Sequence, residues 1–327
     1  MRNKYTEEER IMYYLGIDLG GTNAAAGVVN EDYQIIGKAS VPTNAKDGVD
    51  AIVKNIVKAA KNAIAESGLT ESDIASIGIG SPGAVDPEKG VVDFAGNLGF
   101  DHTPLAALVG EYFPGKKVLL ENDANVAAYA EHMAGAAKGT KDSITITLGT
   151  GVGGGMVING RIYSGFNNKG AEFGHIVIER DGWECSCGRR GCWEAYASVS
   201  GLIRLTKQEM LRDKGSVMWE IAGGSLDNVN GLTSFDAMRR GDHTAVYVVE
   251  SYLRSVAAGL INVINILQPE VICIGGGISK EGDYLLKPIQ EIVNSEMFAK
   301  RSDTFTQVRI AKLGNDAGII GAALLNA

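Results

Sequence analysis

The feature that most constrains the fold of this chain is a weak internal repeat. Residues 14–30 read YLGIDLGGTNAAAGVVN, and residues 144–160 read ITITLGTGVGGGMVING. Each segment is an apolar run, a turn rich in glycine and threonine, a second apolar run and an asparagine, which is typical of a β-hairpin. The two segments align without gaps at an offset of about 130 residues, the size of one domain. The sequence therefore predicts a duplicated domain, with a glycine-rich hairpin at the start of each copy.

The rest of the chain is predicted to alternate between strands and helices. Strands are expected at residues 74–79, 116–123 and 271–275, and helices at residues 48–67, 124–135, 195–214, 244–267 and 314–327. Residues 81–87, SPGAVDP, are expected to form a loop. Over 327 residues, this alternation indicates an α/β protein with two domains of ordinary size.

Composition excludes several classes of function. The formal net charge is -8, whereas nucleic-acid binding requires a basic face for the phosphate backbone. Hydrophobic residues make up 45% of the chain, yet no apolar run approaches the roughly 20 residues that span a bilayer. The N-terminus, MRNKYTEEERIMYY, lacks the apolar stretch of a signal peptide. We therefore expect a cytoplasmic protein that binds neither nucleic acid nor membrane.

Three glycine-rich turns are candidates for phosphate binding. They are DLGGT at 18–22, GTGVGGG at 149–155 and GGGIS at 275–279. Glycine lets backbone N–H groups approach phosphate oxygens closely, and a threonine hydroxyl adds another donor. Any one turn could equally be a tight hairpin that binds nothing. Three turns in one chain, two of them related by the repeat, favour phosphate binding.

The sequence excludes two common types of phosphate-binding site, the P-loop and the dinucleotide-binding fold. The chain has no Gly-x-x-x-x-Gly-Lys-Ser/Thr motif, so it is not a P-loop protein. The second turn matches Gly-x-Gly-x-x-Gly, but the following MVING continues as strand where a dinucleotide fold needs a helix. Asp18 ends a buried strand beside the first turn, a position that suits a Mg²⁺ ion bound through water. The alternative for Asp18 is that it stabilises the turn.

The segment ENDANVAA, residues 121–128, places two polar side chains between a strand and a helix. Asp123 sits where a helix N-cap belongs. It also sits where a carboxylate could take the proton of a hydroxyl nucleophile during phosphoryl transfer. Asn122 beside it could hold a second hydroxyl. These roles of Asp123 are compatible, and the spacing does not decide between them.

A cluster of cysteines offers a metal site. His175, Cys185, Cys187 and Cys192 provide one imidazole and three thiolates, the ligand set of a closed structural zinc site. Disulfides are rare in a reducing cytosol, Cys-x-Cys is too tight for an easy one, and no Cys-x-x-Cys redox motif is present. Four protein ligands leave no open position for substrate, which favours a structural role. Reduced cysteines packed as small hydrophobic residues fit poorly beside Glu184, Arg189 and Arg190.

Together these motifs resemble the ROK family of sugar kinases and sugar-responsive repressors, and within it the bacterial glucokinases most closely. The resemblance extends from about Tyr13 to Ala327. The segments that carry it are DLGGT, ENDANVAA, LGTGVGGG, GHIVI, CSCGRRGCWEAYAS and IGGGIS. It implies the actin-like, ribonuclease H-like fold, with two α/β domains around a cleft. The expected small domain comprises residues 13–122 and about 313–327, and the large domain comprises 123–312 with a zinc-binding loop at 175–192. Residues 1–12 would be an N-terminal extension.

The resemblance also implies roles for individual residues. Asp123 would be the general base, and His175 would bind zinc through one ring nitrogen and sugar through the other. The implied sugar contacts are Gly83, Asn97, Asn122, Asp123, Glu172, His175 and Glu194. The implied nucleotide and Mg²⁺ contacts are Asp18, Gly20, Gly21, Thr22, Asn23, Thr150, Gly151, Gly276 and Gly277.

The function implied by the resemblance is transfer of the γ-phosphoryl group of ATP to the 6-hydroxyl of glucose. Kinases of N-acetylmannosamine, N-acetylglucosamine or fructose are the alternatives within the family, and polyphosphate is an alternative donor. A repressor would need an N-terminal helix-turn-helix domain, whereas DLGGT begins at position 18 of an acidic chain. A sugar-binding protein without activity is disfavoured by Asp18, Asp123 and the three turns. The family also implies a homodimer.

Overall fold

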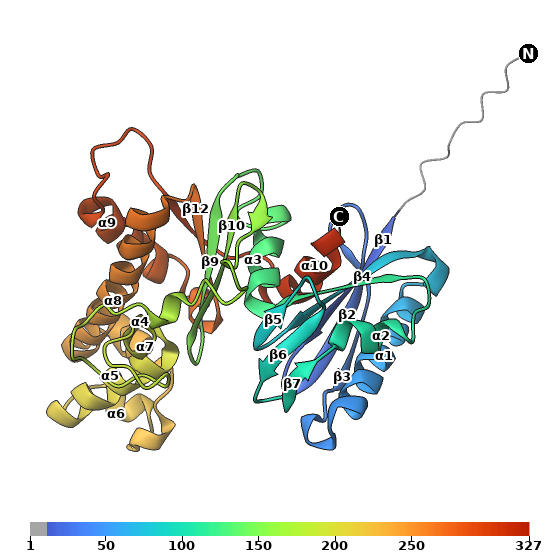
Figure 1. Cartoon of the computed structure of the whole chain (residues 1–327). Coiled ribbons are helices and arrows are strands. Elements are labelled where there is room, and N and C mark those ends of the chain that lie inside the picture. The colour runs from blue at the N-terminus through green and yellow to red at the C-terminus, as the bar shows by residue number, and fades with distance from the viewer. Residues whose placement is uncertain (1–11, 327) are drawn as a thin grey trace, which may run out of the picture. The chain divides into compact units, whose positions relative to one another are not determined.

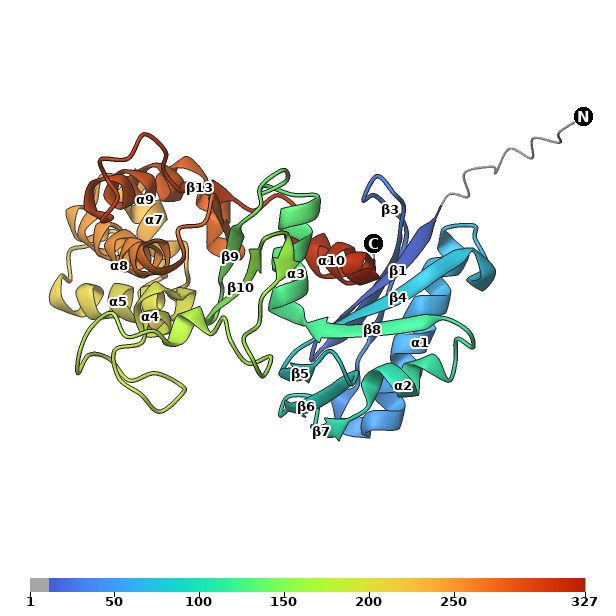
Figure 2. The ribbon, with the colours of Figure 1, turned by 45° about the horizontal axis from the view of Figure 1, so that its top comes forward.

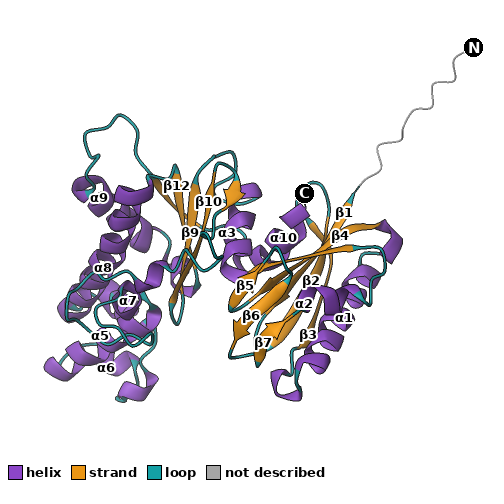
Figure 3. Cartoon of the chain, in the orientation of Figure 1, coloured by secondary structure: helices purple, strands orange, loops and turns teal. Residues whose placement is uncertain are grey.

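The computed structural model describes residues 12–326 and consists of two compact units of mixed helix and sheet (Figures 1 and 3). Unit 1 contains the chain up to Ala134, the short segment Ser164–Gly170 and the C-terminal segment from Asn315. Unit 2 contains Gly135–Tyr163 and Ala171–Gly314. The α/β class is confirmed. The predicted N-terminal extension lies, except for Met12, outside the described residues.

The duplicated hairpin is confirmed by the topology of the two main sheets. In each sheet a three-stranded antiparallel meander is followed by two further strands that pair in parallel. The spatial order is β3-β2-β1-β4-β8 in unit 1 and β11-β10-β9-β12-β13 in unit 2, so corresponding strands occupy corresponding places. The strands are β1 (Tyr13–Leu19), β2 (Asn23–Val29), β3 (Ile35–Pro42), β4 (Ile74–Ser81), β8 (Lys117–Asn122), β9 (Ser143–Leu148), β10 (Val152–Ile158), β11 (Arg161–Ile162), β12 (Val271–Gly275) and β13 (Gln307–Ile310).

Helices cover both faces of the sheet of unit 1 (Figure 2). On one face, apolar residues of β1 and β4 pack with α1 (Val49–Glu66) and α2 (Leu105–Gly110) in one hydrophobic core. The other face carries α3 (Asp123–Met133) and α10 (Ala317–Ala323). The expectation of a loop at residues 81–87 was wrong in part, because Ala84–Asp86 form strand β5. This strand pairs with β6 (Val91–Ala95), which pairs with β7 (Phe100–Thr103), in a small sheet.

A row of glycines allows α10 to lie directly on the sheet. Gly27, Gly16 and Gly78 are neighbours on β2, β1 and β4 in the strand register. A Cβ at Gly16 would overlap the carbonyl oxygen of Ile319, and one at Gly78 would overlap that of Ala322. The helix therefore packs against bare backbone, closer than side chains would permit.

Gly78→Ala is expected to destabilise the protein, because the new methyl group and the α10 backbone cannot occupy the same space. Overpacking of this kind costs roughly 1–3 kcal/mol of unfolding free energy. Gly110→Ala is the matched control, since a Cβ there meets only Val118 at 3.7 Å. Urea unfolding monitored by circular dichroism would measure both variants, and equal stability of Gly78→Ala and wild type would refute the close packing.

Helix α3 groups with unit 1, whereas the boundary expected from the sequence placed residues from 123 onward in the large domain. The cause is long-range packing. Val126 of α3 fits against Gly80 of β4, where a Cβ would lie 2.6 Å from the valine Cγ2. On its other side, α3 approaches α10 at Gly321, where a Cβ would overlap the carbonyl oxygen of Val126.

The core of unit 2 forms between its sheet and a group of helices around α8 (His243–Leu267). Ile144, Ile146, Ile272 and Ile274 of the sheet belong to the same hydrophobic cluster as Val256 and Leu260 of α8. The neighbouring helices are α4 (Trp193–Ala197), α5 (Val199–Arg212), α6 (Met218–Ile221), α7 (Thr233–Arg239) and α9 (Asp283–Glu296). The helix expected at 195–214 is thus two helices, because Ser198 ends α4 and caps α5 through Gly201 N–H.

Candidate functional site

The first glycine turn joins β1 to β2 in unit 1 and is held by local hydrogen bonds. The Gly20 N–H donates to the Asn23 carbonyl at 2.9 Å, and the Thr43 hydroxyl donates to the Gly20 carbonyl at 2.6 Å. Thr22 and Asn23 are exposed. A Cβ at Gly21 would lie 3.2 Å from Asn97 Nδ2, so the structure brings a predicted sugar residue next to a predicted phosphate turn.

Asn122, at the junction of β8 and α3, is the N-cap of the helix. The prediction that Asp123 is the N-cap was therefore wrong. The Asn122 Oδ1 accepts the N–H groups of Ala124 at 2.9 Å and Asn125 at 3.3 Å. Its Nδ2 donates to the carbonyl of Gly83 at 3.0 Å, which fixes the amide orientation. Asp123 is the first residue of the helix, and its Oδ1 accepts the Ala124 N–H at 2.8 Å. Its carboxylate also interacts with the Asn122 side chain. A carboxylate has about four acceptor positions, so Asp123 retains some of them for a ligand.

Asp18 and Asp123 form an electrostatically coupled pair of carboxyl groups. Burial and, to a smaller extent, the charge of Asp123 raise the pKa of Asp18 to about 6, although Lys38 acts in the opposite direction. Burial also raises the pKa of Asp123, while its hydrogen bonds partly offset this effect. Two partly buried carboxylates that repel each other favour a bound cation, so the residues present fit a divalent metal ion at Asp18.

The raised pKa of Asp123 predicts a pH dependence of any reaction that uses it as a base. The carboxyl must be ionised to accept a proton, so kcat/KM should fall as the pH is lowered through its pKa, which lies above the ordinary value of 3.8. The measurement is a kcat/KM profile from pH 4.5 to 8, with circular dichroism to verify folding at each pH. A rate that stays constant while the protein remains folded would contradict this role.

The second glycine turn lies in unit 2 and contacts Glu194 of α4. The Glu194 Oε2 accepts the Val152 N–H at 3.1 Å, and a Cβ on Gly151 would lie 2.5 Å from the same oxygen. Thr150 is exposed, and its carbonyl accepts the hydroxyl of Ser200 at 2.8 Å. The structure thus brings Thr150 and Gly151, which were predicted to contact the nucleotide, next to Glu194, which was predicted to contact the sugar.

The predicted metal ligands converge in unit 2. One ligand atom from each of His175, Cys185, Cys187 and Cys192 lies within 4.8 Å of the others. The Sγ atoms of Cys187 and Cys192 are 3.7 Å apart, and Cys185 Sγ is 3.6 Å from His175 Nδ1. Tetrahedral zinc with ordinary bond lengths requires about 3.8 Å between two sulfurs and about 3.6 Å between sulfur and nitrogen. The four residues therefore fit a structural zinc ion.

The buried Cys192 thiol would ionise at neutral pH only with a cation bound beside it. Burial, and then the neighbouring Cys187 thiol, raises the pKa of Cys192 to about 12. At neutral pH this thiol would stay protonated unless a metal ion displaced the proton. Because Nδ1 of His175 faces the sulfurs, its Nε2 is the nitrogen left for a substrate.

Aromatic residues that the sequence analysis did not single out hold the metal loop in place. Trp193, directly before Glu194, is fully buried against α8, where Gly259 leaves room for the indole and Ser255 accepts its N–H at 2.8 Å. Trp183 stacks on Tyr196 with ring centroids 4.7 Å apart, and Arg204 covers it at 4.3 Å. The three aromatic residues of the segment WECSCGRRGCWEAY could have indicated from the sequence that this loop is packed against other side chains.

The remaining predicted residues occupy turns and element ends. Glu172 is exposed at the start of the short 3-10 helix Phe173–His175. Gly276 and Gly277 follow β12. Gly276 has a positive φ of 90°, and a Cβ on it would collide with the backbone of Leu148. Gly83, with a φ of 96°, accepts the Asn122 bond described above.

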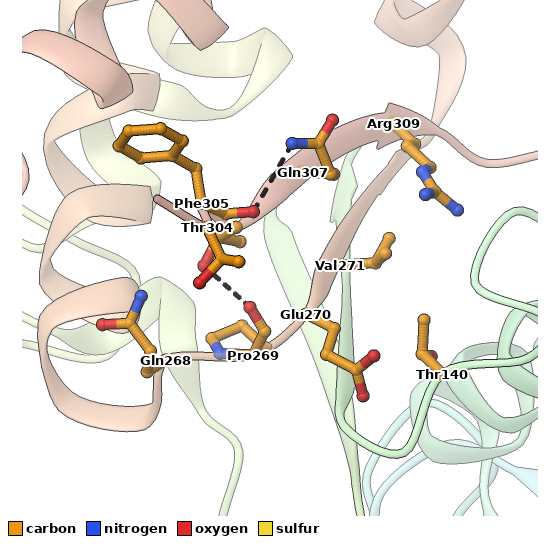
Figure 4. Close-up of a pocket in the computed structure, with 10 residues that line it drawn as sticks. Thr140, Gln268, Pro269, Glu270, Val271, Thr304, Phe305, Gln307 and Arg309 are labelled. Carbon is orange, nitrogen blue, oxygen red and sulfur yellow. Dashed lines mark hydrogen bonds between the residues drawn. The ribbon is translucent and has the colours of Figure 1, made fainter. Parts of the chain in front are cut away.

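Several cavities of similar size occur in unit 2, and two of them lie at the ends of strands of its sheet. One, of about 410 Å³, is lined by Thr150, Gly151, Ser186, Glu194 and Arg204, among others. The other, of about 450 Å³, lies at the N-terminal ends of β12 and β13 (Figure 4). Its charged groups are already engaged, because Glu270 accepts the Lys141 N–H at 2.7 Å and Arg309 donates to the Ala136 carbonyl at 2.8 Å. The first cavity is lined by four of the predicted site residues, Thr150, Gly151, Cys185 and Glu194, whereas the second is lined by none of them.

Comparison with known proteins agrees with this arrangement. The ROK family model matches residues 14–327. This chain belongs to the ROK family. It is 38% identical to a glucokinase of Halalkalibacterium halodurans over 96% of this chain and 94% of the relative, and 37% identical to a glucokinase of Thermotoga maritima over 94% and 95%.

The ROK fold is confirmed by solved structures. The chain superposes with a TM-score of 0.77 on a ROK glucokinase from Streptomyces griseus in complex with glucose and AMPPNP, at 37% identity over 95% of this chain and 98% of that one. The actin-like fold is therefore confirmed for this ROK protein. Among its described helices, none has the length and apolar character needed to span a bilayer.

Proposed function

We propose that this ROK protein is an ATP-dependent glucokinase that transfers the γ-phosphoryl group of ATP to the 6-hydroxyl of glucose. The observation that carries the proposal is the partly buried Asp123 carboxylate. Asn122, and not Asp123, caps the helix, so Asp123 keeps acceptor positions for a substrate hydroxyl. The glucokinases at 37–38% identity over nearly the whole chain support glucose as the acceptor. The neighbour with bound AMPPNP supports a nucleotide as the donor.

In the proposed reaction, a carboxylate oxygen of Asp123 accepts the proton of the sugar 6-hydroxyl as that oxygen attacks the γ-phosphorus. The bond from phosphorus to the bridging oxygen breaks, and ADP leaves with the electron pair. The raised pKa of Asp123 suits this task, since a base with a pKa nearer neutrality binds the transferred proton more strongly. The products are ADP, glucose 6-phosphate and a proton.

The remaining residues would bind and orient the two substrates. Glu172, His175, Glu194, Asn97, Asn122 and Gly83 would contact the sugar. Gly20, Gly21, Thr22, Asn23, Thr150 and Gly151 would donate to phosphate oxygens, and Gly276 and Gly277 would lie against the adenosine. Asp18 would hold Mg²⁺, which neutralises phosphate charge when bound. Zinc at the Cys₃His cluster would stabilise the loop that presents His175. A homodimer stays a prediction from the family.

A coupled assay of ADP release over a panel of hexoses tests the proposal. We expect the highest kcat/KM with glucose, and lower values with mannose, fructose, N-acetylglucosamine and N-acetylmannosamine. Parallel reactions with ATP and with polyphosphate would identify the donor. A clear preference for an N-acetylated sugar would reassign the substrate within the family, and the absence of ADP release with every hexose would overturn the kinase proposal.

A further inference from the structure

The carboxylate of Glu194 joins two separate parts of unit 2. Its Oε2 accepts the backbone N–H of Val152 in the second glycine turn at 3.1 Å. Its Oε1 accepts the hydroxyl of Ser186 at 2.9 Å, and Cys185 Sγ lies 3.5 Å from the same oxygen. Oε1 is thus held by the Ser186 hydroxyl and the Cys185 thiol, and Oε2 is held by one backbone N–H and retains a lone pair for another donor.

Ser186 stands between two ligands of the metal cluster, Cys185 and Cys187. A cysteine that binds zinc does so as a thiolate and has no proton to donate. In the metal-bound protein, Cys185 would therefore repel the Glu194 carboxylate at short range. The Ser186 hydroxyl is then the donor that keeps Oε1 directed toward the metal loop.

The backbone of Glu194 is itself well anchored. The preceding Trp193 is fully buried and donates to Ser255, which leaves the rotation of the Glu194 side chain as the main freedom of the carboxylate. Ser186, Glu194 and Thr150 all line the cavity of about 410 Å³ described above. A hydrogen bond to Ser186 would therefore set the direction in which Glu194 offers its remaining lone pairs to a ligand.

We propose that Ser186 is a positioning residue for the acceptor sugar: its hydroxyl orients Glu194 so that the carboxylate accepts sugar hydroxyl groups. This inference rests on the proposed function, because it takes the hexose as the ligand of Glu194. It assigns a substrate-related task to a side chain inside the metal loop that is not itself a metal ligand.

Ser186→Ala tests this inference, since it removes the hydroxyl and keeps the Cβ. We expect the Kd and KM for glucose to rise about tenfold, as for loss of one hydrogen bond to a charged group, while kcat and the KM for ATP change less than about twofold. Ser186→Thr retains the hydroxyl and should restore binding. Ser295→Ala, which removes a hydroxyl that donates to Ile292 on α9, is the matched control.

Zinc content and glucose affinity are measured together, by metal analysis and by calorimetry without nucleotide. A full zinc content with weakened glucose binding in Ser186→Ala supports the inference. Unchanged glucose affinity in Ser186→Ala, or weakened binding that accompanies zinc loss, overturns it while leaving the proposed function intact. Absence of glucose binding by the wild type would overturn the proposed function and, with it, the role of Ser186.

Discussion

Asp123→Asn is expected to lower kcat by about 10³-fold while leaving the Kd for glucose within about threefold of wild type. Loss of a general base costs roughly 10²–10⁴-fold in rate. The asparagine keeps the size of the side chain and can still accept the Ala124 N–H, so the start of α3 should persist. The substitution removes only the ability to take up the proton of the 6-hydroxyl.

Asp283→Asn provides the matched control for this substitution. Asp283 is exposed at the start of α9 and pairs with Lys287 at 2.7 Å, so its loss should leave kcat unchanged. Single-turnover kinetics and calorimetry would separate transfer from binding. If Asp123→Asn transferred the phosphoryl group at near the wild-type rate, Asp123 would not be the base.

The second large effect is expected from Cys187→Ser, which removes one ligand of the proposed zinc ion. The variant should lose about one zinc ion per chain, and its Kd for glucose should rise by a factor on the order of 10–100. The reason is local: the same loop carries His175 and Ser186, and Cys192 precedes Trp193 and Glu194. The Kd for nucleotide should change by less than about threefold, because the loop supplies none of the expected adenosine contacts.

Cys273→Ala is the control for the cysteine variant. Cys273 is buried in β12 and lies outside the metal cluster, so this variant should keep its zinc. Metal analysis of the purified proteins and calorimetry with glucose and nucleotide are the measurements. A wild-type protein free of zinc would contradict the assignment, as would equal loss of glucose and nucleotide affinity in Cys187→Ser.

Features fixed by local pattern could be predicted from the sequence. The repeat predicted a glycine-rich hairpin at the start of each of two domains, because apolar runs around a glycine turn specify a hairpin wherever they occur. The matching strand order of the two sheets was found only in the structure. The spacing of His175, Cys185, Cys187 and Cys192 predicted a cluster whose sulfur and nitrogen distances suit zinc. In both cases the information lies within a few tens of residues.

Features that depend on long-range packing could not be predicted in this way. The glycines on β1, β2 and β4 have no local sequence feature that indicates their role. They contact α10, which lies some 300 residues from β1 in the chain. The same contacts assign α3 to unit 1. The N-cap of α3 is Asn122, one residue before the predicted Asp123, because sequence alone does not define the first residue of a helix to within one position.

The most direct test of the central claim is the detection of glucose 6-phosphate formed from glucose and ATP by the purified wild-type protein. A reaction coupled to an enzyme specific for glucose 6-phosphate would be run beside ADP release, with 6-deoxyglucose as the comparison sugar. We predict equal amounts of ADP and glucose 6-phosphate from glucose, and no sugar-dependent ADP from 6-deoxyglucose. ADP release that does not depend on a 6-hydroxyl, or that occurs without glucose 6-phosphate, would contradict the account.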